Sequence, residues 1–441
     1  MSATGGRGPL GRALAALGGG AFLRESASYA ASTAAEQGSR LVTGLVVAGM
    51  LGPERWGYWF LLNLVLSYGA LLHLGTLNGM NREVPAALGR EEPERAVRLE
   101  RVTLGALLAS VCGAALLLAA LSAWPAVREA LPPRDGFLML GLLAAHQLYA
   151  FVTMRGRSRM RFGLVSRQQA FFAVLHPLFA VGGAWAWGLS GFIVGQALAY
   201  LVTVAATSRG GWGLPRPELS VHEWRALVGV GLPIMLVGVV HTFFTTVDRW
   251  IVVRFLGVEA LGHYSLAVMT VSAVRLLPQV FEQQTYPRMA FAWSSRRDAA
   301  ELRRLGARQS SLTFASAALV SVPAAVLAPV VVHAWLPEYA PGLGALLVAL
   351  SVPFATGVGR GYGNVLNVIG RQSVYLTSIL GATAVNAVAS LALVGPLGLT
   401  GVSLGTALGF HALSLGLLGF GGRALARAAE EAPAAARTTA G

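Results

Sequence analysis

Three arginines, Arg40, Arg275 and Arg360, lie inside long apolar stretches of the sequence. A charged side chain at the centre of a bilayer costs roughly 2.5–3.5 kcal/mol on insertion scales, so each of the three calls for a functional or structural reason. The planar guanidinium group binds phosphate oxygens through two parallel hydrogen bonds. The three arginines therefore indicate an anionic cargo that carries phosphate, and helix packing or local ion pairing is the alternative.

The residues around these arginines are polar at helical spacing. Glu36 precedes Arg40 by four positions, which is the favourable order for an ion pair on one helix face. Glu282 lies seven positions after Arg275, too far to pair with it directly along a helix, so the partner of Arg275 is an external anion or a group on another helix. Asn364 follows Arg360 by four positions and extends its polar face, where its amide would suit sugar hydroxyls.

A second polar group is predicted near residues 241–249. His241, Thr245, Asp248 and Arg249 share one face of a continuous helix, which favours Arg249 as a further substrate contact. Asp248 and Arg249 would instead act as interface anchors if they lie at the membrane surface. Asp248, Glu36 and Glu282 are the carboxylates placed to couple transport to H⁺ or Na⁺. The intramembrane histidines lack the spacing of a metal site, so neither a metal nor a cofactor is expected.

The composition is that of an integral membrane protein. Of 441 residues, 55% are hydrophobic and 12% are charged, and the mean hydropathy is +0.60, whereas soluble domains carry about 25% charged residues. All 34 basic residues are arginine, and the net charge is +14. Because these arginines are spread over many loops without a basic stripe, we expect no binding to nucleic acid.

Twelve apolar stretches approach the ~20 residues that a helix needs to cross the hydrocarbon core. They are 27–50, 57–79, 102–124, 137–154, 168–187, 190–207, 229–252, 262–283, 309–334, 343–366, 372–394 and 399–421. If both termini are cytoplasmic, 26 arginines lie in cytoplasmic segments and four in outer loops, which fits the positive-inside rule. The sequence therefore predicts an all-α fold with about twelve transmembrane helices and cytoplasmic N- and C-termini.

The chain also repeats itself. The phrase LGPERWGYW at residues 51–59 returns as LGVEALGHY at 256–264, and GLSG at 188–191 returns as GLTG at 398–401. The offsets of 205 and 210 residues indicate that the chain consists of two copies of one unit. Because each copy has six spans, an even number, both halves have the same orientation in the membrane. They form two six-helix bundles related by a pseudo-two-fold axis along the membrane normal. The predicted parts are a cytoplasmic lead-in (1–25), bundles at 26–207 and 229–422, a linker (208–228) and a cytoplasmic tail (423–441).

At LGPERWGYW, LxxLGTLNGMNREVPAALGR, VDRWIVVRFLGVEALGHY and GLTGVSLGTALG the chain resembles the oligosaccharide flippase (Wzx-type polysaccharide export) family. That family belongs to the multidrug/oligosaccharidyl-lipid/polysaccharide exporter superfamily. The resemblance implies a central cavity between two bundles and movement of a polyprenyl-diphosphate-linked oligosaccharide to the outer leaflet of the bacterial inner membrane. It also implies that Arg40 and Arg275 bind the diphosphate. Arg360 is our own addition to these two, because it lies on the polar face of its predicted helix.

The predicted function is thus that of a flippase for lipopolysaccharide or exopolysaccharide precursors. One alternative is an ion-coupled exporter of drugs or organic cations, whose cavity should be lined mainly by carboxylates. The other is a lipid II flippase, although this chain lacks the extra pair of helices found in that group. An enzyme is not expected, because the outer loops are too short for a catalytic domain. The predicted partners are the lipid-linked oligosaccharide and membrane lipids, with a polysaccharide polymerase or glycosyltransferases as further candidates.

Overall fold

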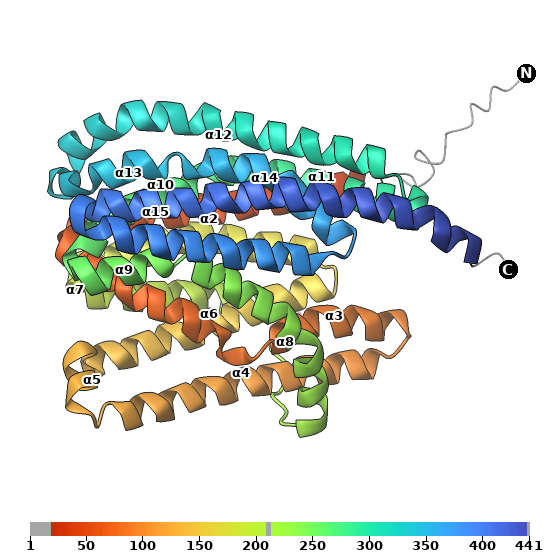
Figure 1. Cartoon of the computed structure of the whole chain (residues 1–441). Coiled ribbons are helices and arrows are strands. Elements are labelled where there is room, and N and C mark those ends of the chain that lie inside the picture. The colour runs from red at the N-terminus through yellow and green to blue at the C-terminus, as the bar shows by residue number, and fades with distance from the viewer. Residues whose placement is uncertain (1–18, 209–212, 439–441) are drawn as a thin grey trace, which may run out of the picture. The chain divides into compact units, whose positions relative to one another are not determined.

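The computed structural model of the protein describes residues 19–208 and 213–438, and in these ranges it contains helices and no strand (Figure 1). Parts of the predicted lead-in, linker and tail, namely 1–18, 209–212 and 439–441, lie outside the described residues. The elements are α2 (Gly19–Gly69), η1 (Ala70–His73), α3 (Thr76–Gly89), α4 (Pro93–Leu121), α5 (Pro125–Ala130), α6 (Pro133–Ser158), α7 (Phe162–Thr207), α8 (Val221–Phe244), α9 (Val247–Leu256), α10 (Val258–Val274), α11 (Leu276–Arg296), α12 (Ala299–Trp335), η2 (Pro337–Gly342), α13 (Leu343–Ala349), α14 (Val352–Val368) and α15 (Gln372–Thr438).

Kinks at glycine divide the longest helices. Gly52 in α2 has φ 74° and ψ 168°, and Gly257, 205 residues later, has φ 92° and ψ 178° between α9 and α10. Gly188 in α7 (φ 60°, ψ −138°) and Gly398 in α15 (φ 56°, ψ −134°) form a second matching pair. Positive φ is readily adopted only by glycine. The repeated phrases therefore share a backbone geometry, which supports the predicted duplication of the chain.

The predicted membrane spans correspond to helical segments of the structure. Among the described residues, eight helices are long and apolar enough to cross a membrane, and the bent pair of Ala27–His73 and Thr76–Gly89 makes a ninth candidate. The kinks at Gly52, Gly188 and Gly398 each divide one candidate in two. This gives one segment for each of the twelve predicted ranges, and the all-α membrane fold is confirmed.

The chain divides into two compact units, with boundaries inside α2, η1 and α8. Unit 1 comprises the described residues up to 43 and those from 72 to 232. In it the buried carboxylate of Glu100 on α4 accepts hydrogen bonds from Arg155 (2.8 Å) and Arg159 (2.5 Å) at the end of α6. Arg155 also donates to the carbonyl of Gly213, so one buried acid joins α4, α6 and the segment that leads to α8.

Unit 2 comprises residues 44–71 and the described residues from 233 onward. Its helices α12, α14 and α15 run alongside one another (Figure 1), and α14 packs against both neighbours. A buried cluster that includes Phe244, Val352, Leu366, Ile379 and Phe410 joins α8, α14 and α15. Burial of such side chains contributes about 1.5–3 kcal/mol each relative to exposure in water, and in lipid close packing takes over this role. The predicted bundle limits stay predictions.

Within unit 2, α2 after its kink and α10 approach closely through two glycines. A Cβ on Gly57 would lie 2.0 Å from the carbonyl oxygen of Val258, and a Cβ on Gly262 would lie 1.9 Å from that of Pro53. The contact is reciprocal, since both the glycines and their partners are 205 residues apart. Small residues that let helix backbones touch are the usual means of association in lipid.

Candidate anion-binding cavity

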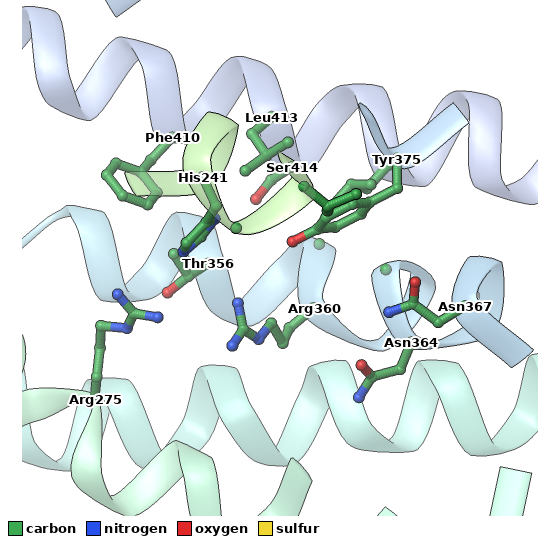
Figure 2. A pocket seen from close by; sticks show the side chains of 15 residues that line it. His241, Arg275, Thr356, Arg360, Asn364, Asn367, Tyr375, Phe410, Leu413 and Ser414 are labelled. Atoms are coloured by element: carbon green, nitrogen blue, oxygen red, sulfur yellow. The ribbon is translucent and has the colours of Figure 1, made fainter. Parts of the chain in front are cut away.

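A polar cavity of about 300 Å³ lies inside unit 2, among α8, α14, α15 and the junction of α10 with α11 (Figure 2). Ligand pockets commonly measure about 300–1,000 Å³, so the volume suits a small headgroup. Half of the polar lining residues come from α14. The polar or charged residues that line the cavity are His241, Arg275, Thr356, Arg360, Asn364, Asn367, Tyr375 and Ser414.

The sequence of α14 explains how its polar face reaches the cavity. Thr356, Arg360 and Asn364 are spaced by four residues and therefore form one stripe on the helix. Gly357 and Gly361 lie on another side, where a Cβ would meet the backbone of Phe314 at 2.8 Å or the carbonyl of Gly306 at 2.0 Å. These glycines allow α14 to pack directly against α12, and this packing orients the polar stripe toward the cavity.

Two guanidinium groups face each other in the cavity. The side chains of Arg275 and Arg360 point toward one another, with His241 and Thr356 close by (Figure 2). Arg360 Nε donates to Glu282 Oε1 at 2.7 Å, an ion pair between α14 and α11. Arg275 forms no ion pair within 4 Å with any described carboxylate; Arg360 repels it, and Glu282 attracts it from a greater distance. The pair Arg360–Glu282 is neutral as a unit, so the described residues of the cavity carry one positive charge in excess.

Amide and hydroxyl groups continue the lining beyond the arginines. Asn364 Nδ2 donates to Gln309 Oε1 of α12 at 3.2 Å, so its Oδ1 faces the cavity. The Oγ1 of Thr356 donates to the carbonyl of Pro353 at 2.9 Å, which leaves its lone pairs free to accept. His241 Nδ1 is buried and has no hydrogen-bond partner among the described residues. The cavity thus combines a cationic end with groups that can form hydrogen bonds to hydroxyl or amide functions.

Arg275, Arg360 and Asn364, three of the five predicted substrate contacts, meet in this cavity. Arg40 lies elsewhere, in unit 1. It donates to Glu36 at 2.9 Å and to the hydroxyl of Tyr200 at 2.8 Å, and its guanidinium stands 4.4 Å from the ring centroid of Phe172. Tyr149 donates a further hydrogen bond of 3.2 Å to Glu36. The local ion pair that the spacing allowed is therefore formed, and the role of Arg40 in substrate binding stays a prediction.

The predicted common face of residues 241–249 is wrong, because the helix is interrupted. α8 ends at Phe244 and α9 begins at Val247, and the hydroxyls of Thr245 and Thr246 donate back to the carbonyls of His241 and Thr242. The prediction applied helical spacing across this break and therefore placed all four residues on one face. Of these, only His241 lines the cavity.

Asp248 and Arg249 therefore have surroundings of their own. Asp248 is buried at the start of α9, where it accepts hydrogen bonds from the hydroxyl of Tyr264 at 2.7 Å and from the backbone N–H of Arg249 at 2.9 Å. The Nε of Arg249 is buried with no hydrogen-bond partner in the described part of the chain. Neither residue lines the cavity, and ion coupling through Asp248, Glu36 or Glu282 stays a prediction.

Among the described residues, no three His, Cys, Asp or Glu side chains are grouped as metal ligands.

The α15 side of the cavity was missed by sequence reasoning. Tyr375 comes from the start of α15, and Phe410, Leu413 and Ser414 come from its second half, after the kink at Gly398. Ser414 donates a hydrogen bond to the carbonyl of Ala355 on α14 and lies against Gly359. Phe410, Leu413 and Ser414 occur in a mainly apolar phrase, and Tyr375 lies in a short polar phrase at the start of a span, so only the packing of α15 on α14 reveals them.

The model of the family described as "Polysaccharide biosynthesis protein" matches residues 22–293. The chain belongs to the polysaccharide biosynthesis protein family. This confirms the resemblance found in the sequence, because the family is that of the Wzx-type flippases. A search among curated proteins finds no significant match. Members of this flippase family are transporters rather than enzymes, and the chain is a multi-pass membrane transporter of this family.

Solved structures of the superfamily share the fold of this family member. The inward-facing conformation of a multidrug resistance MATE family transporter aligns with a TM-score of 0.70 at 17% identity, over 90% of this chain and 96% of that one. The outward-facing conformation of a multidrug resistance MATE family transporter aligns with a TM-score of 0.61 at 17% identity, over 93% and 96%. A MOP superfamily transporter from Pyrococcus furiosus Vc1 (DSM3638), described by a binding pocket of reverse polarity that suggests a different function, aligns with a TM-score of 0.60 at 16% identity, over 92% and 96%.

Proposed function

We propose that this transporter moves a polyprenyl-diphosphate-linked oligosaccharide from the cytoplasmic to the outer leaflet by alternating access, for export of a cell-surface polysaccharide. The observation that supports the proposal is the guanidinium of Arg275, which no described carboxylate pairs, beside that of Arg360 in the cavity of unit 2. Arg360 offers Glu282 only its Nε, so its terminal N–H groups remain available. Two such groups suit the oxygens of a diphosphate, each through charge-assisted hydrogen bonds.

The charge of the cavity favours an anion over an organic cation. Among the described residues its lining holds two arginines and no carboxylate, and Glu282, which lies outside the lining, is already paired with Arg360. A cation entering the cavity would meet Arg275 without a free described carboxylate to balance it. For the Pyrococcus furiosus transporter of the same fold, a binding pocket of reverse polarity is described as suggesting a different function.

The membrane potential would assist this direction of transport. Outward movement of two negative charges from a negative interior releases about 4.6 kcal/mol at 100 mV, at roughly 2.3 kcal/mol per charge, unless counter-ions move with the cargo. H⁺ or Na⁺ is the proposed coupling ion if one is used. The proposed location is the bacterial cytoplasmic membrane with both termini cytoplasmic, since this places 26 of 34 arginines on the inner side.

The proposal is tested by equilibrium binding to the purified full-length protein in detergent. The probes are farnesyl diphosphate, uncharged farnesol and the cationic dye ethidium, measured by calorimetry. We expect farnesyl diphosphate to bind at least tenfold more tightly than farnesol, and ethidium not to compete with it. Preferential binding of ethidium, or equal binding of the diphosphate and the alcohol, would favour an exporter of organic cations and contradict the proposal.

A further inference from the structure

The turn between α11 and α12 corresponds to the turn between α3 and α4 in the other copy of the repeat, but the two differ in charge. Glu91 (φ 63°) and Arg297 (φ 50°), 206 residues apart, have the same left-handed backbone conformation in these turns. Residues 82–101 hold five arginines and five glutamates, whereas residues 288–308 hold six arginines and two acids, a net charge of 0 against +4. The positive-inside rule applies to both copies alike, so the excess at the second turn calls for a reason of its own.

Two arginines at the start of α12 continue an exposed apolar face of that helix. Arg304 and Arg308 are exposed and four residues apart, so they lie on one face. The same face passes through the predicted span 309–334 with exposed apolar side chains, namely Leu319, Val322 and Val326. An extended apolar face of a membrane span that no other part of the protein covers is in contact with lipid. Arg304 and Arg308 therefore lie on the lipid side of α12, where this face leaves the hydrocarbon core.

The end of α15 repeats this arrangement. Phe420 is exposed inside the predicted span 399–421. Arg423 and Arg427 follow it by three and seven residues, on the same face, and both are exposed. This helix also carries arginines on its lipid side, directly after the apolar span.

The start of α12 and the end of α15 pack together with the end of α11. Trp293 of α11, Leu302 of α12 and Leu425 of α15 belong to one buried cluster, at the end of unit 2 where α12 begins and α15 ends (Figure 1). The four arginines lie one to six residues outside the predicted spans, which corresponds to about 2–9 Å along the helices. The headgroup region on each side of the hydrocarbon core is roughly 5–8 Å thick, so these guanidinium groups lie at the depth of lipid phosphates.

Three of the four arginines are open to a ligand. Arg304 forms an exposed ion pair of 2.9 Å with Glu301, and such pairs contribute little to stability. Arg308, Arg423 and Arg427 form no ion pair within 4 Å with a carboxylate in the described part of the chain. None of them lines the cavity of unit 2. This surface therefore offers unpaired guanidinium groups to the headgroup layer, away from the proposed cargo site.

We propose that Arg308, Arg423 and Arg427 bind the phosphates of anionic phospholipids, such as phosphatidylglycerol, at the end of unit 2 that is predicted to be cytoplasmic. Each guanidinium group can donate charge-assisted hydrogen bonds to phosphate oxygens. A lipid suits this surface better than an acidic protein does, because its acyl chains lie against the apolar faces of α12 and α15 that the arginines continue. A zwitterionic lipid suits it less well, since its ammonium group offsets the phosphate charge. The lipid site is separate from the cavity and does not depend on the proposed cargo.

The test compares phosphatidylglycerol with phosphatidylcholine of the same acyl chains, added to the full-length protein in detergent and measured by native mass spectrometry. We expect wild-type protein to bind phosphatidylglycerol at least roughly tenfold more tightly, because each arginine near an anionic lipid adds to its affinity. The triple variant Arg308→Gln, Arg423→Gln and Arg427→Gln should reduce this preference to about threefold or less, and each single change should reduce it by about twofold.

The duplicated chain supplies a matched control. Arg95→Gln, Arg98→Gln and Arg101→Gln together remove the same charge from exposed positions of α4, at the neutral turn of unit 1, and should keep the full preference. Arg275→Gln lowers the charge of the cavity and should also keep it, because the phospholipid binds elsewhere.

Equal binding of the two phospholipids by wild-type protein would overturn the lipid site, and so would a full preference that persists in the triple variant. An equal loss in the α4 variant would overturn it as well, because the effect would then follow net charge alone. Loss of the preference in Arg275→Gln would show that the headgroup enters the cavity instead. The wild-type comparison and the single variants decide even if the triple variant does not fold, and none of these results depends on whether farnesyl diphosphate binds.

Discussion

Replacement of Glu282 by glutamine should tighten binding of a diphosphate, although it removes an ion pair. Glu282 accepts from Arg360 Nε at 2.7 Å and is the described carboxylate paired with an arginine of the cavity. A phosphate on the other edge of Arg360 would stand roughly 6–8 Å from that carboxylate, where like charges repel by about 2–3 kcal/mol at an effective dielectric constant of 20. Glutamine keeps a carbonyl oxygen for the hydrogen bond to Arg360 but removes this repulsion.

Water in the open cavity screens part of that energy, so we expect a gain of about 1–2 kcal/mol, or roughly 5- to 30-fold in affinity. The assay is calorimetric titration of Glu282→Gln and wild-type protein with farnesyl diphosphate at one ionic strength. Glu301→Gln is the matched control, since Glu301 pairs with Arg304 on the surface of α12, away from the cavity lining, and should change affinity less than twofold. Unchanged or weaker binding in Glu282→Gln would refute an anion site at Arg360.

Three further predictions concern stability, each measured as the melting temperature in detergent. Gly262→Ala should destabilise the protein by about 1–3 kcal/mol because its Cβ would meet a backbone carbonyl, whereas Gly381→Ala, in open space, should not; equal melting temperatures would disprove the close helix contact. Glu100→Gln should destabilise by about 3–5 kcal/mol, since two arginines lose a buried carboxylate; a loss below about 1 kcal/mol would show that the network is solvated. Arg40→Gln should leave the buried Glu36 without its ion-pair partner and lower the melting temperature, and the added change Glu36→Gln should restore part of it. A double variant less stable than Arg40→Gln would exclude loss of the ion pair as the cause.

The membrane fold could be predicted because hydropathy and glycine placement are local properties of the sequence. Each of the twelve predicted ranges has its helical segment, and the glycines of the repeated phrases, such as Gly52 and Gly257, mark the bends. The polar stripe of α14 was also predictable, because a continuous helix turns side chains four residues apart to one side. That reasoning failed at residues 241–249, where Thr245 and Thr246 interrupt the helix.

Contacts between helices could not be predicted in the same way. The partner of Arg360 is Glu282, 78 residues away on another helix, and no spacing rule links the two. Arg40 and Arg275 looked alike in the sequence, as single arginines in apolar spans. The structure separates them, because Arg40 is bound by Glu36 and Tyr200 whereas Arg275 faces a cavity. Packing of distant segments thus distinguishes a paired arginine from one that is open to a ligand.

The most direct test of the account is the flipping of a fluorescent undecaprenyl-diphosphate oligosaccharide in proteoliposomes, followed by quenching of the label in the outer leaflet. We predict that wild-type protein flips this lipid, that Arg275→Gln lowers the rate at least tenfold, and that Arg288→Gln, at an exposed arginine on α11, leaves it within twofold. Matched incorporation and melting temperatures of the three proteins serve as the control. A normal rate in Arg275→Gln, or a wild-type protein that moves only cationic dyes, would contradict the anionic cargo.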